Sequence, residues 1–228
     1  MARAYSRAAF LTLSAGFCLL APTSAAAQGA GPSFGIQAGG GVADQRGSDA
    51  FFVWDVASPQ GAVFLNLPLG PSSGLGLQVE AMFLGKGGRE NTDRRFSPSG
   101  DPGTKQRQTF FQLPVLLRFE FGSASVRPVV FGGFAPAFSL NCRVETFSGT
   151  SSVKEDCSDS VVSFVQRTTQ FDAVGGVGLN IDAGRGVFVL DFRADVQLGS
   201  TDDSGADRDV ANRDLAALIG YRFPLGGR

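Results

Sequence analysis

Short strand-like segments recur at regular intervals and restrict what this chain can fold into. Apolar residues occupy every second position over most of eight segments, which cover residues 34–43, 60–69, 75–86, 108–122, 126–140, 168–181, 186–198 and 213–224. Alternation over about ten residues is typical of strands whose two faces meet different surroundings. No stretch of useful length in this region shows the roughly 3.6-residue repeat of a helix. The pattern therefore predicts an all-β fold.

The connections between these segments alternate strictly in length. Three are short and rich in turn residues, at 70–74, 122–125 and 182–186. The other four are long and polar, at 44–59, 87–107, 141–167 and 199–212. Up-and-down barrels of bacterial outer membranes have this asymmetry, with short periplasmic turns and longer extracellular loops. We expect residues 34–228 to form an eight-stranded antiparallel up-and-down transmembrane β-barrel in the outer membrane of a Gram-negative envelope.

The segment at 186–198 shows the two faces most clearly. Phe188 and Phe192 lie on one face, and Asp191 and Arg193 lie on the other. Neighbouring opposite charges favour an arrangement in which the charged face lines the barrel interior. Since the interior of an eight-stranded barrel is about filled by its own side chains, we predict a salt-bridged plug rather than a lined channel or a carboxylate active site. The predicted interior charge network is Glu80, Arg118, Glu120, Asp172, Asp191, Arg193, Asp195, Asp214 and Arg222.

Large aromatic residues lie on the apolar faces, mostly near the strand ends. In a membrane barrel they face the lipid and form its interfacial girdle, and they are Phe111, Phe119, Phe121, Phe188, Phe192, Tyr221 and Phe223. The fifth segment is ambiguous, because Phe131, Phe134 and Phe138 do not share one face. It also contains Pro128 and Pro136, and proline removes a hydrogen-bond donor from the ladder, so we expect a bulge or the barrel rim there.

Residues 1–27 have the three-part layout of a secretory signal peptide. Arg3 and Arg7 precede a short apolar stretch, and small residues then form an A-x-A-type cleavage site. The apolar stretch is shorter than the roughly 20 residues that a spanning helix needs. Cys18 suggests a lipoprotein signal as an alternative, but a large residue precedes it where such signals have a small one. We expect cleavage at the end of this segment, which leaves residues 28–33 as a short lead into the barrel.

Histidine is absent from the sequence, and only two cysteines follow the predicted cleavage site. The absence excludes Ser-His-Asp and Cys-His nucleophile systems, imidazole acid–base catalysis and histidine-ligated metals. We therefore expect no enzymatic activity, no catalytic residue, no metal site and no cofactor. Cys142 and Cys157 are expected to form a disulfide, because the periplasm is oxidising. A redox or metal-binding pair is the alternative.

Charge is modest, with a net charge of −1. A nucleic-acid partner would require a concentrated basic patch, so we expect none. The loop at 87–107 carries both signs and suits contacts with lipopolysaccharide phosphates or a partner, although a solvated loop is the simpler interpretation. Carboxylates in the last long loop lack the spacing of an EF-hand, and we interpret them as a solvated acidic loop: Asp202, Asp203, Asp207 and Asp209. We expect a monomer in contact with outer-membrane lipid and lipopolysaccharide.

Three motifs resemble those of a known family. Residues 110–119 read FFQLPVLLRF, residues 127–133 read RPVVFGG, and residues 172–178 read DAVGGVG, with Val174 in place of the family's first glycine. They are similar to strand motifs of the outer-membrane β-barrel domain family that includes PorT-like proteins. The resemblance covers essentially the whole chain after the signal and implies an architecture like that of OmpA- and OmpX-type barrels. The chain departs from many such barrels in that its last aromatic, Phe223, is not the terminal residue.

Together these features predict an integral outer-membrane barrel that contributes to envelope structure or binds through its extracellular loops. Three alternatives stay open: a small-solute channel, a soluble periplasmic lipid-binding barrel, and the secretion-assisting role that the resemblance to PorT-like proteins implies. A barrel enzyme, such as a lipid hydrolase, is a further alternative, and the missing histidine argues against it.

Overall fold

The computed structural model describes residues 31–48, 50, 56–70, 73–89, 103–148, 151–157, 168–200 and 210–225. The predicted signal peptide lies outside these residues, as do residues 28–30 of the predicted lead. The same holds for the four aspartates of the last long loop, Asp202, Asp203, Asp207 and Asp209. Among the described residues, no helix has the length and apolar character needed to cross a bilayer.

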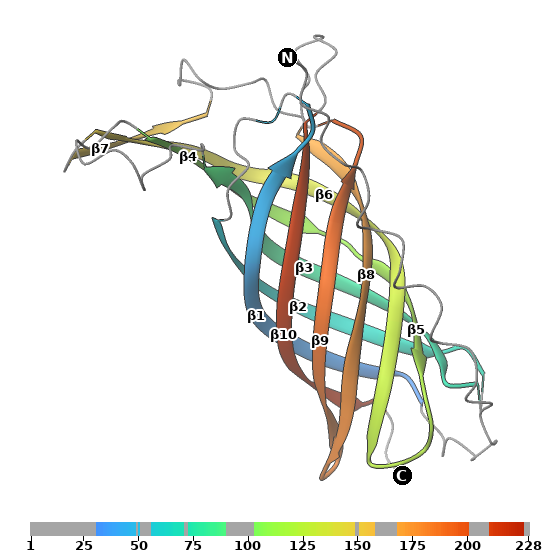
Figure 1. Cartoon of the computed structure of the whole chain (residues 1–228). Helices are drawn as coiled ribbons and strands as arrows, with labels where there is room; N and C mark the ends of the chain where they lie inside the picture. The colour runs from blue at the N-terminus through green and yellow to red at the C-terminus, as the bar shows by residue number, and fades with distance from the viewer. Residues whose placement is uncertain are drawn as a thin grey trace, which may run out of the picture.

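In the described part of the chain, ten strands pair into one sheet that closes on itself (Figure 1). They are β1 (Ser33–Arg46), β2 (Val56–Pro68), β3 (Leu75–Arg89), β4 (Gly103–Gln112), β5 (Val115–Glu120), β6 (Val126–Ser148), β7 (Ser151–Asp156), β8 (Thr169–Ala183), β9 (Gly186–Leu198) and β10 (Ala211–Pro224). β1 pairs antiparallel with both β2 and β10, which closes the ring. Neighbours in the ring otherwise follow one another along the chain, so the topology is up-and-down.

β4 and β5 together occupy one position in the ring, between β3 and β6. Pro114 separates them, because proline has no N–H to donate to the ladder. The gap stays hydrogen-bonded, since Glu80 N donates to Pro114 O at 2.9 Å and Leu113 N donates to Pro136 O at 2.9 Å. With β7 outside the ring, the structure has the eight barrel positions that the sequence predicts.

The fifth predicted segment corresponds to β6, and its irregularity lies elsewhere than expected. Pro128 and Pro136 both keep their places in the pairing with β8. The register instead shifts against β4, where Thr109 pairs with Asn141 and Phe110 pairs with Ser139, so that Leu140 is skipped. Neither proline therefore forms the predicted bulge, whereas Pro128, the third residue of β6, lies at the barrel rim beside the short turn at 122–125, as the alternative predicted.

The three short turns lie at one end of the barrel. Each contains a glycine with positive φ, at Gly74 (62°), Gly122 (80°) and Gly184 (63°), a conformation that other residues adopt at a cost. The start of β1 and the end of β10 lie at this same end, since Ser33 pairs with Pro224. Because short turns face the periplasm in such barrels, we call this end periplasmic.

Three strands continue past the barrel at the opposite end. β3, β4 and β6 stay paired as far as Arg89, Gly103 and Phe147, within stretches that the sequence assigns to long loops. β7 then pairs with the end of β6. The resulting four-stranded extension, which we call the projecting sheet, leans away from the barrel at the upper left of Figure 1. The predicted loops 87–107 and 141–167 are thus partly strand, and of their charges Glu90, Asp93, Arg94 and Arg95 lie outside the described residues.

The two barrel faces differ sharply in polarity. Inward positions carry buried amides and charges, for example Gln37, Gln78 and Asn180, whereas outward positions carry exposed apolar side chains such as Ile36 and Ile219. Apolar interior contacts form two small clusters, one around Met82 and Phe110 and the other around Leu116. A soluble barrel would have the reverse arrangement, so the outer face suits contact with hydrocarbon.

Candidate functional site

Two ion-paired groups occupy the middle of the barrel interior. Arg193 of β9 contacts Glu80 of β3 across the barrel at 2.9 Å, and it contacts Asp195 on its own strand at 3.2 Å. Arg118 of β5 donates two hydrogen bonds to the carboxylate of Asp191 on β9, at 2.7 and 2.9 Å. All five side chains are at most 3 % exposed. The strand alternation accounts for this gathering, because residues two apart on one strand point to the same side.

A third buried pair links Lys86 of β3 to Asp172 of β8. Gln112 also donates to Asp172 at 2.6 Å, and the Lys86 ammonium lies 5.3 Å from the centre of the Phe110 ring. Sequence reasoning left Lys86 out of the interior network. The signal was present, because Lys86 has the same strand parity as Gln78 and Glu80.

Asp214 of β10 lies inside the barrel, fully buried, but its contacts differ from those of the other carboxylates. Gln60 of β2 donates a hydrogen bond to it. Asp195 is its directly paired neighbour on β9. Among the described residues, no cation forms an ion pair with Asp214, so this carboxylate is held by an amide.

The two remaining members of the predicted network form a separate cluster at the periplasmic rim. Glu120 contacts Arg222 at 2.9 Å and Arg127 at 3.1 Å. Arg127 also contacts Asp182 at 2.7 Å. Sequence reasoning missed Arg127 and Asp182, although each lies beside a short turn where neighbouring strands come together. The cluster links the ends of four strands, β5, β6, β8 and β10, at this rim.

The predicted membrane-facing aromatic residues all lie on the outer surface. Phe188, Phe192 and Phe223 are exposed, and Phe111, Phe119, Phe121 and Tyr221 are partly covered by neighbours. Ring contacts at the periplasmic end join Tyr221 to Phe188 at 5.1 Å and to Phe223 at 4.7 Å between centroids. The Tyr221 hydroxyl donates to Ala183 O at 2.8 Å, which suits a ring at a membrane interface with one polar end.

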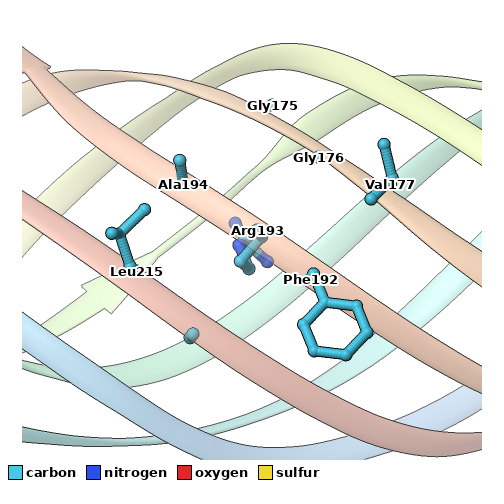
Figure 2. Close-up of a pocket in the computed structure, with 8 residues that line it drawn as sticks. Gly175, Gly176, Val177, Phe192, Arg193, Ala194 and Leu215 are labelled. Carbon is cyan, nitrogen blue, oxygen red and sulfur yellow. The ribbon is translucent and has the colours of Figure 1, made fainter.

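A shallow hollow marks the outer face of β8, β9 and β10. Figure 2 shows Val177, Phe192 and Leu215 around it, while Arg193 points to the far side of the sheet. Gly175 and Ala194 pair directly and leave the floor low, because neither has a long side chain. The outward groups around the hollow are apolar, so the hollow suits contact with an acyl chain rather than a catalytic site.

A disulfide anchors the projecting sheet. Cys142 on β6 is bonded to Cys157 just after β7, with their Cα atoms 5.4 Å apart. Cys157 N also donates to Cys142 O at 3.1 Å, and Gln106 Nε2 lies 3.5 Å from the Cys142 sulfur. The bond closes the β6–β7 hairpin near the point where the sheet leaves the barrel. The disulfide thereby fixes the end of β7 to β6, which is itself continuous with the barrel.

A closed antiparallel ring with a charged interior and an apolar exterior defines a transmembrane β-barrel. The chain belongs to the outer membrane protein beta-barrel domain family, whose model matches residues 26–203. This membership confirms the predicted location in the outer membrane and removes the soluble periplasmic alternative. The family match does not extend to the narrower resemblance to PorT-like proteins.

Several solved barrels are similar to this chain at low sequence identity. The outer membrane enzyme PagL is 14% identical over 84% of this chain and 99% of its own, with a TM-score of 0.47. Neisserial surface protein A is 14% identical over 86% and 99%, with a TM-score of 0.43. Ail of Yersinia pestis, solved with the heparin analogue sucrose octasulfate, is 13% identical over 85% and 99%, with a TM-score of 0.42. No curated protein matches the chain.

One prediction needs correction here. The sequence led us to expect that the chain is not an enzyme, and that conclusion is wrong as drawn, because the similar barrel PagL is an outer membrane enzyme. The absence of histidine excludes only mechanisms that need histidine. A barrel of this kind therefore does not decide between an enzymatic and a non-enzymatic role.

Proposed function

We propose that this protein is a closed, non-conducting barrel that holds the projecting sheet at the cell surface as a binding platform. Its role is then to anchor a rigid extracellular surface in the envelope. The observation that carries the proposal is the interior, where each of the cations Lys86, Arg118 and Arg193 contacts a buried carboxylate.

The paired interior supports a closed lumen for two reasons. Eight strands leave an interior that side chains about fill, and here long side chains such as Phe64, Lys86 and Gln106 are less than 2 % exposed. An ion pathway would also require the paired charges to separate, and a buried charge without its partner costs about 3–5 kcal/mol. The small-solute channel is therefore the less favoured alternative.

The projecting sheet supports the binding role. It continues three barrel strands, since β4 stays paired with β6 from the barrel to Gly103 and Phe147, with one register shift at Leu140. The disulfide fixes the hairpin that forms its edge. A surface held in this way loses little further freedom when it binds, which favours affinity. The secretion-assisting role implied by the resemblance to PorT-like proteins stays a prediction.

Conductance across planar bilayers tests the closed lumen. The purified barrel should insert without steady single-channel openings. A variant with the Arg118–Asp191 and Glu80–Arg193 pairs replaced by serine (R118S, D191S, E80S, R193S) should conduct, which controls for the sensitivity of the assay. Heat-modifiable gel mobility verifies that each protein is folded. Steady openings of the wild type would contradict the proposal.

A further inference from the structure

The outward face of the projecting sheet carries an excess of positive charge. Cross-strand pairing places Arg89 directly opposite Lys105, and Arg107 directly opposite Arg143. Directly paired residues lie on the same face of a sheet, as do residues two apart on one strand. The face that results, here called the basic face, has five cations and two carboxylates: Arg89, Lys105, Arg107, Arg143, Lys154, Glu145 and Asp156.

Two cross-strand pairs on the basic face place like charges directly opposite one another, Arg89 with Lys105 and Arg107 with Arg143. Carboxylates compensate them in part, because Lys105 also pairs with Glu145 and Arg143 also pairs with Asp156. Like charges directly opposite one another destabilise a sheet. Glu145 contacts Lys154 at 3.5 Å, but among the described residues no carboxylate forms an ion pair with Arg107 or Arg143. The pKa of Lys105 lies below its ordinary value, because partial burial and the charge of Arg107 disfavour its protonated form. An anion from outside the chain would relieve this repulsion.

The position of the basic face indicates which anion it meets. Lys105, Arg107, Thr109 and Phe111 lie on one face of β4, so the cations continue upward from the lipid-facing side. At a rise of about 3.4 Å per residue, the Cα atom of Arg107 lies at most about 14 Å beyond that of Phe111 along the strand. Phe111 packs against Phe83 at 5.3 Å between ring centroids on the same apolar surface. The cations therefore lie just above the hydrocarbon, at the level of the lipid headgroups.

We propose that the basic face binds the phosphate groups of lipopolysaccharide in the surrounding outer leaflet. This inference rests on the proposed function, since it takes the projecting sheet to lie outside the cell. Arg107 and Arg143 are both exposed, and their side chains start about 5 Å apart, which suits two guanidinium groups around one phosphate. The chain as a whole has a net charge of −1, so the excess of positive charge belongs to this face and not to the chain in general.

Binding of lipopolysaccharide to the full-length mature barrel in detergent tests the proposal. The probes are deep-rough lipopolysaccharide and the same material chemically dephosphorylated. The test variant is Arg107→Gln with Arg143→Gln. The matched control is Arg185→Gln, which removes an exposed arginine in a periplasmic turn at the other end of the barrel. Heat-modifiable mobility verifies folding of every variant.

The wild type and the Arg185→Gln control should bind the phosphorylated form at least about tenfold more tightly than the dephosphorylated form, as charge-assisted contacts predict. The double variant should lose most of this preference. An unchanged preference in the double variant would overturn the proposal. Displacement of lipopolysaccharide by millimolar inorganic phosphate would also overturn it, because it would indicate a site for soluble anions. Steady ion conductance of the wild type would contradict the proposed closed barrel but would leave the lipopolysaccharide binding results unchanged. Failure of the proposed function and failure of this inference are therefore distinguishable.

Discussion

The buried pair of Arg118 and Asp191 offers the sharpest test of the interior. Replacing Asp191 with alanine leaves the Arg118 guanidinium buried without its bidentate partner. Glu80 does not replace that partner freely, because it is engaged by Arg193 at 2.9 Å. The Phe131 ring, whose centre lies 4.8 Å from the Arg118 guanidinium carbon, offers only a weaker cation–π contact.

The expected loss follows from the exposure of the pair, which is 2% for Arg118 and 3% for Asp191. Breaking a buried pair by removing one partner costs about 3–5 kcal/mol. Replacing both partners by apolar residues of similar volume, Arg118→Met with Asp191→Leu, should be close to neutral, because no charge then stays unpaired. Lys154→Gln breaks the exposed contact with Glu145 and should cost less than about 1 kcal/mol.

Equilibrium unfolding in guanidinium measures these differences, with the barrel reconstituted in lipid vesicles and heat-modifiable mobility as the readout. The order of stability should be the wild type and the double variant first, then Lys154→Gln close behind, and Asp191→Ala far below. If Asp191→Ala were as stable as Lys154→Gln, water would solvate Arg118, and the reasoning for a filled interior would be refuted.

Three further results are expected. Gly35→Ala should lower stability by about 1–3 kcal/mol, because its Cβ would overlap the buried Phe64 ring, whereas Gly132→Ala, which meets only Val174 O at 3.7 Å, should be nearly neutral in the same unfolding assay. Cys142→Ser should remove about 3 kcal/mol of local stabilisation. Limited proteolysis should then cut the β6–β7 hairpin faster while gel mobility of the barrel stays heat-modifiable, and equal rates would contradict the anchoring role. Thiol titration of the exported wild type without reductant should find no free thiol, and two titratable thiols would contradict the disulfide.

The alternation of side chains made most of the barrel predictable. The strand at Gly186–Leu198 has the predicted bounds, because polarity changes at every residue from Leu190 to Leu198 and a short glycine turn precedes the strand. The ion pairs of the interior were harder to predict, because alternation shows which face of the strand a residue lies on but not its position along the barrel axis. Glu80 and Arg193 are 113 residues apart in the sequence, and only the ring closure brings them together.

The projecting sheet could not be predicted from the same pattern. The inward positions of β4 in this sheet are buried but polar, as at Gln106 and Gln108, so the apolar alternation that identifies strands disappears. The stretch at 103–107 is charged and polar, and it reads as a loop although it pairs with β3 and β6. Proline was also a misleading signal, since Pro114 interrupts a strand whereas Pro128 and Pro136 do not.

The central claim is that charged residues face the interior and apolar residues face the lipid. Spin labels placed singly along β9, in a Cys142→Ser/Cys157→Ser background, test it by their accessibility to oxygen and to a water-soluble nickel complex. Labels at Leu190, Phe192 and Ala194 should be accessible to oxygen, which concentrates in lipid. A label at Val189, which is 3% exposed, should be shielded from both reagents. Loss of this two-residue alternation, or access of the nickel complex to the even-numbered positions, would contradict the account.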